Sequence, residues 1–271
     1  MKFAFLNLGC PDWSPEKMAV EARIMGYDGV ELRSADDNPY AYPDMPYSAR
    51  QALRETFRKE GIEICAIASY NDFGTDNIEK LDKNHANLIA DTVLARDLGA
   101  GVVRSFLGVP EGNLTADDML RAAAPYLNDC ADFAKSLGVK LCFETHDAWC
   151  GGKLIKKAFS YITSPGAYIL WDIENNTEMG EKAEDFFNEV GNKVAHVHIR
   201  DSRRNPETGK WRACLSGEGE VELETCLRLL EKADFDGYVS FEWEKRWIPD
   251  LEGPEIVFPH FINYARTLLS K

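Results

Sequence analysis

Short apolar runs recur along the whole chain, and each is followed by a polar turn and a longer amphipathic stretch. The runs contain few polar positions, which is typical of strands that are buried on both faces. They predict strands at residues 3–8, 29–32, 62–68, 101–106, 139–143, 168–172, 194–199 and 238–243. Since helical stretches separate these runs, the pattern predicts a chain of alternating strands and helices.

Helix boundaries are marked by short polar signals. Ser14 precedes a proline, which is the arrangement of an N-cap followed by proline at the first helical position. Asp76 and Thr115 each precede an acidic residue three positions on, which predicts helices over 76–98 and 115–137. Four glycines stand just after helical stretches, where a left-handed C-cap residue belongs: Gly26, Gly61, Gly99 and Gly138.

Eight strand–helix units, paired in parallel by right-handed crossovers, either close into a barrel or leave a doubly wound open sheet. The sequence lacks the G-x-G-x-x-G turn expected after the first strand of a dinucleotide-binding sheet. Its 271 residues are typical of one complete barrel, and no linker divides them. We therefore predict an α/β protein with a single (β/α)8 TIM barrel over residues 1–271. Functional side chains then belong at the carboxyl ends of the strands.

Charge and hydropathy limit the partners. The formal net charge is −14, and because phosphate backbones repel such a surface, we expect no nucleic-acid partner. The longest basic cluster is Arg200, Arg203 and Arg204, which suits either a solvated loop or a contact with an anionic group of a substrate. No apolar stretch reaches the roughly 18 residues of a membrane span, so we expect no membrane partner.

The N-terminal segment and the cysteines bear on the cellular compartment. Residues 1–9 resemble a signal peptide, but Asn7 interrupts the apolar run and Pro11 follows it, so we interpret the segment as the first strand. The seven cysteines are odd in number and form no C-x-x-C pair, which argues against a disulfide framework or a zinc ribbon. This usage suits a reducing compartment, and we expect a cytoplasmic protein with Cys65 and Cys142 in its core.

Ionisable residues follow the apolar runs of the last four predicted strands: Glu144, Asp172, His198 and Glu242. One buried carboxylate can be a structural ion-pair partner, but three that converge without a cation would repel one another. Three oxygen ligands and one nitrogen suit manganese, magnesium or cobalt, with zinc as a further candidate. We predict one divalent metal ion at these four residues, with manganese favoured, and place His196 deeper in the barrel than His198.

A family resemblance rests on the same residues. The chain resembles the xylose isomerase-like TIM barrel superfamily, in its sugar phosphate isomerase/epimerase branch, over nearly its whole length. The matching motifs are Gly29-Val30-Glu31-Leu32-Arg33, Phe143-Glu144-Thr145-His146, Trp171-Asp172-Ile173-Glu174-Asn175, His196-Val197-His198-Ile199-Arg200-Asp201, Gly217-Glu218-Gly219-Glu220-Val221 and Phe241-Glu242-Trp243-Glu244. The resemblance implies the same four metal ligands.

The resemblance also implies an isomerase or epimerase whose small-molecule substrate is a ketose or a related polyol. In epimerases of this branch, the carboxylates that match Glu144 and Glu242 lie on opposite faces of the substrate and move a proton beside a carbonyl. A metal stabilises the enediolate that forms, while a carboxylate takes the carbon-bound proton. Glu144 and Glu242 are therefore predicted to be catalytic residues as well as ligands.

Two positions depart from the family pattern. Asn175 stands where histidine is frequent, and Arg200 stands where lysine is usual. Asparagine can position a hydroxyl group but cannot shuttle a proton at neutral pH. His146 could supply that function, or it could point away from the site.

Further side chains at the strand ends are candidates for substrate binding. Arg33 and Arg104 lie in strands, where an arginine needs a partner, and either substrate oxygens or a carboxylate such as Glu31 would serve. Trp247 belongs to the loop aromatics on the same side, which can stack on sugars or merely cover the core. The predicted substrate contacts are Arg33, Arg104, His146, Asn175, Arg200 and Trp247. We also expect the loop over 202–219 to lie above the metal, with its basic and amide side chains at the entrance.

Other functions fit parts of this pattern. A lyase can remove the same proton and then expel a β-hydroxyl group, as the inosose dehydratases of the same branch do. The DNA-repair endonucleases of the superfamily need three metals, and the histidines that would bind the extra ions are missing from strands three and four. A non-catalytic sugar-binding module would not need intact ligands. The sequence does not decide whether the protein forms a homo-oligomer, although barrels of this kind often form dimers.

Overall fold

A barrel of parallel strands forms the centre of the protein. The computed structural model describes all residues except 36, 39 and 271. Within that range, eight parallel strands close in the order β1-β10-β7-β6-β5-β4-β3-β2. They are β1 (Lys2–Leu6), β2 (Gly29–Arg33), β3 (Glu63–Asp72), β4 (Val102–Phe106), β5 (Lys140–Glu144), β6 (Ala167–Asp172), β7 (Val194–Ile199) and β10 (Tyr238–Phe241). The predicted (β/α)8 barrel is confirmed.

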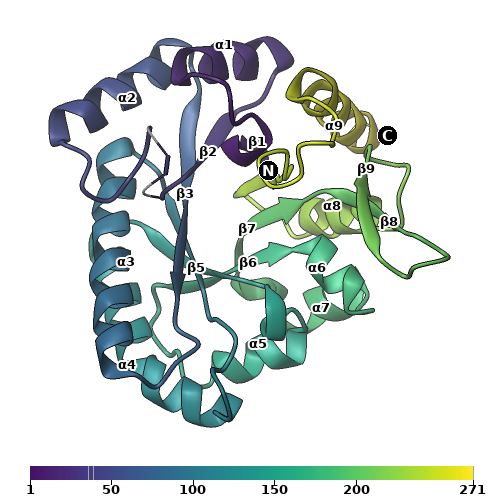
Figure 1. The fold of residues 1–271 in the computed structure, drawn as a ribbon. Coiled ribbons are helices and arrows are strands. Elements are labelled where there is room, and N and C mark those ends of the chain that lie inside the picture. Colours follow the sequence, from purple (N-terminus) through teal and green to yellow (C-terminus); the bar gives the residue numbers. More distant parts are fainter. Residues whose placement is uncertain (36, 39, 271) are drawn as a thin grey trace.

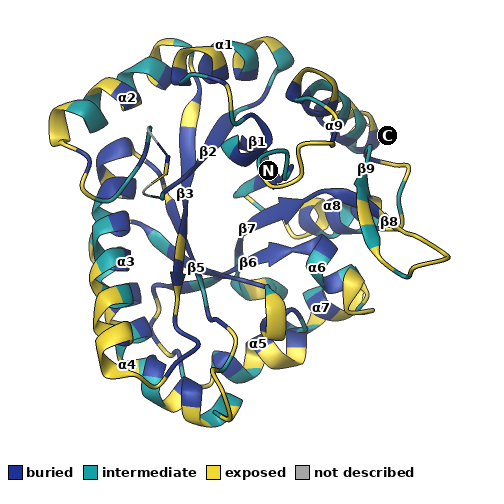
Figure 2. Ribbon diagram, viewed as in Figure 1, coloured by how far each residue is buried: buried dark blue, intermediate teal, exposed yellow. Residues whose placement is uncertain are grey.

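Helices surround the barrel (Figure 1). They are α1 (Pro15–Met25), α2 (Tyr47–Lys59), α3 (Ile78–Leu98), α4 (Ala116–Ser136), α5 (Gly152–Ala158), α6 (Ile173–Glu178), α7 (Ala183–Val190), α8 (Leu223–Lys232) and α9 (Pro254–Leu269), with short 3-10 turns η1 (Asn7–Gly9), η2 (Asp147–Trp149) and η3 (Gly191–Lys193). Figure 2 shows that the strands are mostly buried, whereas the helices expose their outer faces. Burial on both faces explains why the strands are continuous apolar runs in the sequence.

Local sequence signals predicted most of the helix ends correctly. The predicted N-caps Ser14 and Thr115 each accept a hydrogen bond from the N–H three residues on, at 3.3 and 3.2 Å. The predicted start at Asp76 is wrong by one residue, because the side chain of Asn77 caps α3 at 3.1 Å. The four glycines predicted at helix ends all have positive φ angles: Gly26, Gly61, Gly99 and Gly138.

The barrel interior changes character along its axis. One buried cluster consists of small or medium apolar side chains from the strands: Ala4, Cys65, Ala66, Val102, Cys142, Leu170 and Ala195. Cys65 and Cys142 are therefore core residues, as predicted, and all seven cysteines are free. Buried charged side chains take over toward the carboxyl ends, where Glu144 and Asp172 are the last residues of their strands. Among the described residues, no helix has the length and apolar composition needed to cross a membrane.

The segment after β7 forms a hairpin rather than a plain loop. Strands β8 (Asp201–Arg204) and β9 (Trp211–Cys214) pair antiparallel, and they project beside the barrel (Figure 1). The Asp201 carboxylate closes the base of the hairpin by accepting the N–H groups of Gly217 and Gly219 at 2.8 and 2.9 Å. A Cβ at residue 219 would lie 2.0 Å from Asp201 Oδ1, so the close approach requires glycine there.

Candidate active site

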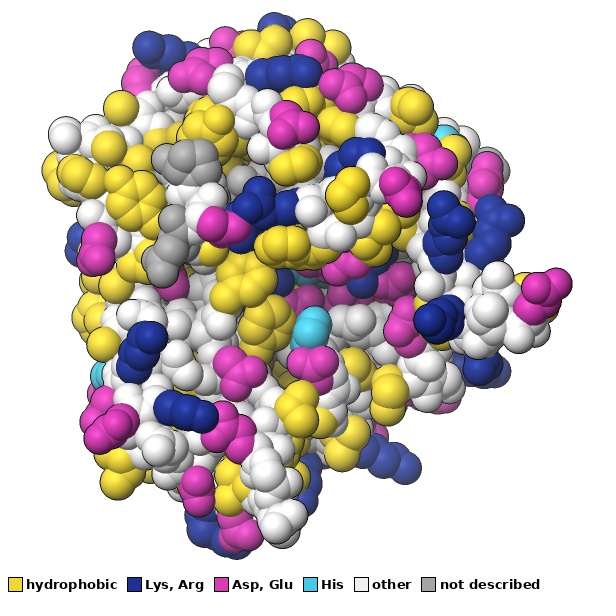
Figure 3. All heavy atoms as spheres, viewed as in Figure 1, with side chains coloured by type: hydrophobic (Ala, Val, Ile, Leu, Met, Phe, Trp, Pro, Cys, Tyr) yellow, Lys and Arg dark blue, Asp and Glu magenta, His cyan; other side chains and the backbone are white. Residues whose placement is uncertain are grey.

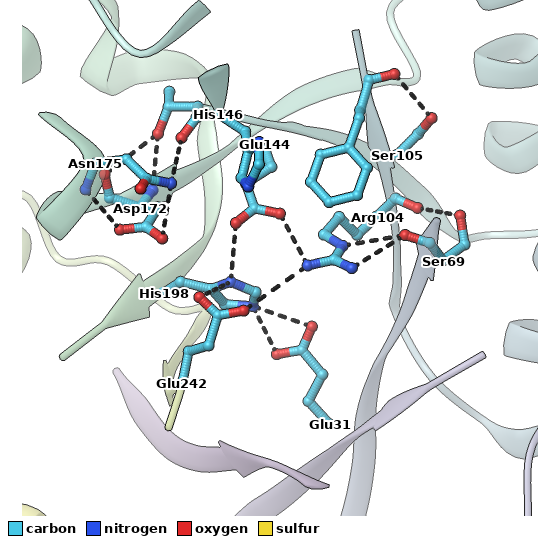
Figure 4. Close-up of polar contacts among 12 residues, drawn as sticks. Glu31, Ser69, Arg104, Ser105, Glu144, His146, Asp172, Asn175, His198 and Glu242 are labelled. Atoms are coloured by element: carbon cyan, nitrogen blue, oxygen red, sulfur yellow. Dashed lines mark hydrogen bonds and ion pairs between the residues drawn. The ribbon is translucent and has the colours of Figure 1, made fainter. Parts of the chain in front are cut away.

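Four strand ends bring together the predicted metal ligands. Glu144 ends β5, Asp172 ends β6, His198 lies in β7, and Glu242 follows β10. Because these strands are neighbours in the barrel, with Asp172 directly opposite His198 in the ladder, their side chains converge (Figure 4). One ligand atom from each of the four lies within 4.8 Å of the others, and all four residues are buried.

The cluster has the properties of a cation site. His198 Nδ1 lies 3.3 Å from Glu144 Oε1 and 3.4 Å from Glu242 Oε2, yet this buried nitrogen makes no hydrogen bond with them. Burial and the neighbouring carboxylates of Glu242 and Glu144 raise the pKa of Asp172 well above its usual value. A divalent ion would relieve that repulsion, and the three oxygens and one nitrogen fit manganese, magnesium, cobalt or zinc.

Glu31 determines which nitrogen of His198 faces the cluster. The carboxylate of Glu31 lies 3.0 and 3.1 Å from His198 Nε2 and 2.9 Å from His196 Nε2. Although burial opposes its ionisation, the two imidazoles hold the pKa of Glu31 well below its usual value. An ionised carboxylate only accepts hydrogen bonds, so each imidazole donates from Nε2, and Nδ1 of His198 is left to face Glu144 and Glu242. His196 lies behind His198 and does not reach the cluster.

Two buried arginines hold the glutamates. Arg104 Nη1 donates to Glu144 Oε2 at 2.9 Å and lies 3.9 Å from Glu242 Oε1. Arg200 Nη1 donates to Glu242 Oε2 at 2.7 Å. Burial opposes ionisation of both glutamates, but Arg104 next to Glu144, and His198 with Arg200 next to Glu242, lower the pKa of each carboxyl group. Both side chains therefore carry the negative charge that a general base needs.

Arg200 also contacts carboxylates on the outer side of the site. Its guanidinium forms an ion pair with Glu174 and lies 3.9 Å from both Asp172 and Glu244. Burial opposes the charge of Arg200, but Glu174 and Asp172 raise its pKa well above the usual value. The residue thus links the ligand cluster to the acidic groups beside it.

Asn175 orients Asp172. Its backbone N–H donates to Asp172 Oδ1 at 3.1 Å, so that Asp172 caps α6, and its side-chain Nδ2 donates to Asp172 Oδ2 at 3.0 Å. The same Nδ2 donates to the carbonyl oxygen of Thr145 at 3.1 Å. Both hydrogens of the amide are therefore directed at protein oxygens, and the remaining amide oxygen is the group that can meet a substrate.

The other predicted substrate contacts lie at the rim. The ring of His146 packs on Phe106 with centroids 4.7 Å apart, and its Nδ1 lies 2.7 Å from Asp147. His146 and Trp247 line the cavity above the cluster, as do Arg104, Asn175 and Arg200. Arg33 is not among the described lining residues; it pairs with Asp37 at 2.8 Å and stacks near Trp247.

Two sequence expectations at the rim need correction. Glu31 is not the partner of Arg33, because Glu31 accepts from both histidines and Arg33 pairs with Asp37. The hairpin does lie on the catalytic side, where its residues line a groove together with Arg200. However, the hairpin stands beside the cluster rather than above it. In Figure 3 the hollow of the site is open and lies to the left of the hairpin.

Sequence reasoning missed several lining residues: Leu8, Tyr70, Phe106 and Glu244. Tyr70 is 39% exposed inside a strand whose other central residues are buried, and its ring lies 5.0 Å from the Arg104 guanidinium. The signal for Glu244 was present in the sequence, because it lies two residues after Glu242 and so shares its direction on an extended segment.

The fold and the site together define the class of this protein. It is a (β/α)8 barrel with a polar site, made of acidic side chains and a histidine, at the carboxyl-terminal face of its strands. Within this class, the chain belongs to the xylose isomerase-like TIM barrel family, whose model matches residues 20–258.

Named relatives of the chain are enzymes. Fructoselysine 3-epimerase of Escherichia coli O157:H7 is 23% identical over 235 residues, which are 82% of each chain. Inosose dehydratase of Clostridium perfringens is 25% identical over 140 residues, which are 46% of this chain and 47% of that one. The structure of the IolI protein with a bound zinc atom is 20% identical, with a TM-score of 0.81 over 100% of this chain and 99% of that one. This structural likeness shows the shared fold.

Proposed function

We propose that this protein is a divalent-metal-dependent epimerase or isomerase that acts on a ketose or a related polyol. The proposal rests on Glu144 and Glu242, two buried carboxylates that face His198 Nδ1 at 3.3 and 3.4 Å. Their strands, β5 and β10, are separated by β6 and β7, so the carboxylates approach a central ligand from different directions. Epimerisation needs this, because one group removes a proton from one face of a carbon and another delivers a proton to the opposite face.

The arginines prepare both carboxylates for proton transfer. Each glutamate is ionised and is held by an arginine, which fixes the direction of its oxygens. Glu144 or Glu242 takes the proton next to the carbonyl group, and the partner returns one to the other face of the enediolate. Arg104, which lies near both glutamates, stabilises the negative charge that develops on the substrate oxygens.

The ligand set supports a metal. A divalent ion held by Glu144, Asp172, His198 and Glu242 would polarise a carbonyl and an adjacent hydroxyl group. Manganese is favoured by the hard oxygen ligands, and zinc is supported by the zinc atom in IolI. Asn175 offers its amide oxygen to a substrate hydroxyl, and Trp247 and His146 line the cavity beside it.

Glutamine substitutions test the proton transfer. Glu144→Gln and Glu242→Gln keep the side-chain size and one oxygen ligand but remove the base, so each variant should bind manganese and lose about 10²–10⁴-fold in turnover. Metal content is measured by elemental analysis, and proton transfer by solvent deuterium entering a ketose panel. Glu63→Gln is the matched control, because that carboxylate lies on the surface 2.7 Å from Lys2. Normal turnover in both metal-loaded variants would contradict the proposal.

A lyase activity is the second candidate, supported by the match to inosose dehydratase. The same base would remove the same proton, after which a β-hydroxyl group leaves as water. An inosose incubated with the manganese-loaded enzyme would then develop the ultraviolet absorbance of an enone. Epimerisation produces no such absorbance, so one spectrum decides between the two reactions.

A further inference from the structure

A groove adjoins the cavity above the ligand cluster, between the β8–β9 hairpin and residues 244–251. Its volume is about 510 Å³, against about 80 Å³ for the cavity itself. The two hollows share Arg200 and Glu244 as lining residues. The cavity holds only the reacting part of a sugar, whereas the groove has the volume of a small-molecule subsite. A longer substrate can therefore extend from the cluster into the groove.

The groove carries charges of both signs on different elements. Lys210 and Arg212 come from the hairpin, while Glu178 comes from α6 and Asp250 from the segment after β10. In the part of the chain that the structure describes, none of these four side chains forms an ion pair within the protein. Figure 3 shows basic side chains on the projecting hairpin and acidic side chains in the hollow to its left.

Apolar side chains also line the groove. They include Trp211 and Ile248, and Ile248 is 43% exposed, so its side chain is available for an apolar contact. Burial and the neighbouring Glu174 carboxylate raise the pKa of Glu178, so a cation beside it would be stabilised.

We propose that this groove binds a charged extension of the substrate, namely an amino acid joined to the keto-sugar through an aliphatic chain. Its carboxylate would meet Lys210 and Arg212, its ammonium group would meet Glu178 and Asp250, and the chain would lie along Trp211. A phosphate would satisfy the hairpin but face the acidic wall, and a simple amine would leave the hairpin cations without a partner. The inference rests on the proposed function, since it places the sugar at the ligand cluster.

Calorimetric titration of the manganese-loaded protein tests this subsite with three probes: D-fructose, fructoselysine, and the fructose conjugate of butylamine, which has the chain but no amino acid. Since exposed ion pairs contribute modestly, two of them should make fructoselysine bind about ten-fold tighter than the butylamine conjugate. Arg212→Glu and Lys210→Glu should each remove most of that preference. Lys83→Glu is the matched control, because Lys83 lines a separate hollow that shares only Tyr70 with the cavity.

Equal affinity for fructoselysine and the butylamine conjugate would overturn the subsite, as would a preference that survives in Arg212→Glu and Lys210→Glu or disappears in Lys83→Glu. Deuterium exchange on the same three probes separates this result from failure of the proposed function. If any probe exchanges without a preference for fructoselysine, only the subsite is wrong. If no probe binds or exchanges, both proposals are wrong.

Discussion

Replacing Glu31 with glutamine tests how the barrel orients His198. The substitution keeps the size of the side chain but exchanges one acceptor oxygen for an NH2 donor. In the wild-type protein, His196 and His198 both donate to Glu31 through Nε2, at 2.9 and 3.0 Å. Because one oxygen, Oε2, accepts from both imidazoles, glutamine keeps both bonds only when its oxygen takes that position. Its NH2 group then stands about where Oε1 lies, 3.1 Å from His198 Nε2, and meets that N–H unless His198 moves its hydrogen to Nδ1. In His198 that hydrogen would point at Glu144 and Glu242, where a metal would bind.

The structure suggests a large effect. Glu31, His196 and His198 are all 0% exposed, so water cannot replace the lost acceptor. Loss of a partner that orients a metal-binding histidine typically lowers metal affinity about 10–100-fold. Because water cannot reach the buried imidazole to take the place of Glu31, we expect a loss of metal affinity near the upper end of that range. The metal-free protein should also lose about 1–3 kcal/mol of stability, because the buried NH2 group of the glutamine faces another donor and has no acceptor.

Manganese affinity is measured by competition with a chelating dye, and the fold of the variant is checked by circular dichroism. Glu63→Gln again serves as the control, because its carboxylate contacts Lys2 and Tyr238 at the surface. If folded Glu31→Gln binds manganese as tightly as the wild-type protein, Glu31 does not orient His198, and the assignment of Nδ1 as the ligand atom is wrong.

Three further predictions concern neighbouring groups. Arg200→Lys should keep manganese affinity but lower turnover about ten-fold, because one ammonium group cannot hold Glu242 and Glu174 together as the guanidinium does; steady-state kinetics on the metal-loaded variant check this. Asn175→Ala removes a donor to Asp172 and should weaken manganese binding about ten-fold in the same dye competition, and an unchanged affinity would show that the cap is dispensable. Manganese at about 100 times its dissociation constant should raise the unfolding free energy of the wild-type protein by about 2.7 kcal/mol in a urea titration, and Asp172→Ala should lose that gain.

The strands and most helix ends could be predicted because their causes are local. Continuous apolar runs reveal strands that are buried on both faces. Ser14 and Thr115 begin helices, and the glycines at helix ends terminate them, through contacts with residues a few positions away. Asp76 and Asn77 are both good N-cap residues, so only the direction of the side chains decides between them. The hairpin was missed because its strands have only four residues each and contain mostly polar residues, so no apolar run marks them.

Some residues of the candidate site could be predicted from the sequence, and others could not. Glu144, Asp172, His198 and Glu242 could be grouped from the sequence because parallel strands end at one face of a barrel. The partners of Glu31 could not be predicted, because spacing along β2 shows which residues share a face of the strand but not which residues lie across the barrel. Glu31 meets two histidines from β7, 165 and 167 residues later in the chain, which no local pattern reveals.

The hairpin has a consequence for how this protein could be altered. The side chains around His198 are held by strands and by buried ion pairs, whereas Lys210 and Arg212 stand on a short exposed ribbon whose shape depends on Asp201 at its base. Mutations over 205–212 therefore change few packed contacts and cost little stability. If the groove binds substrate as proposed, a library confined to those residues would change which molecules the barrel accepts while the buried side chains around His198 stay unchanged, so selectivity and chemistry could evolve separately.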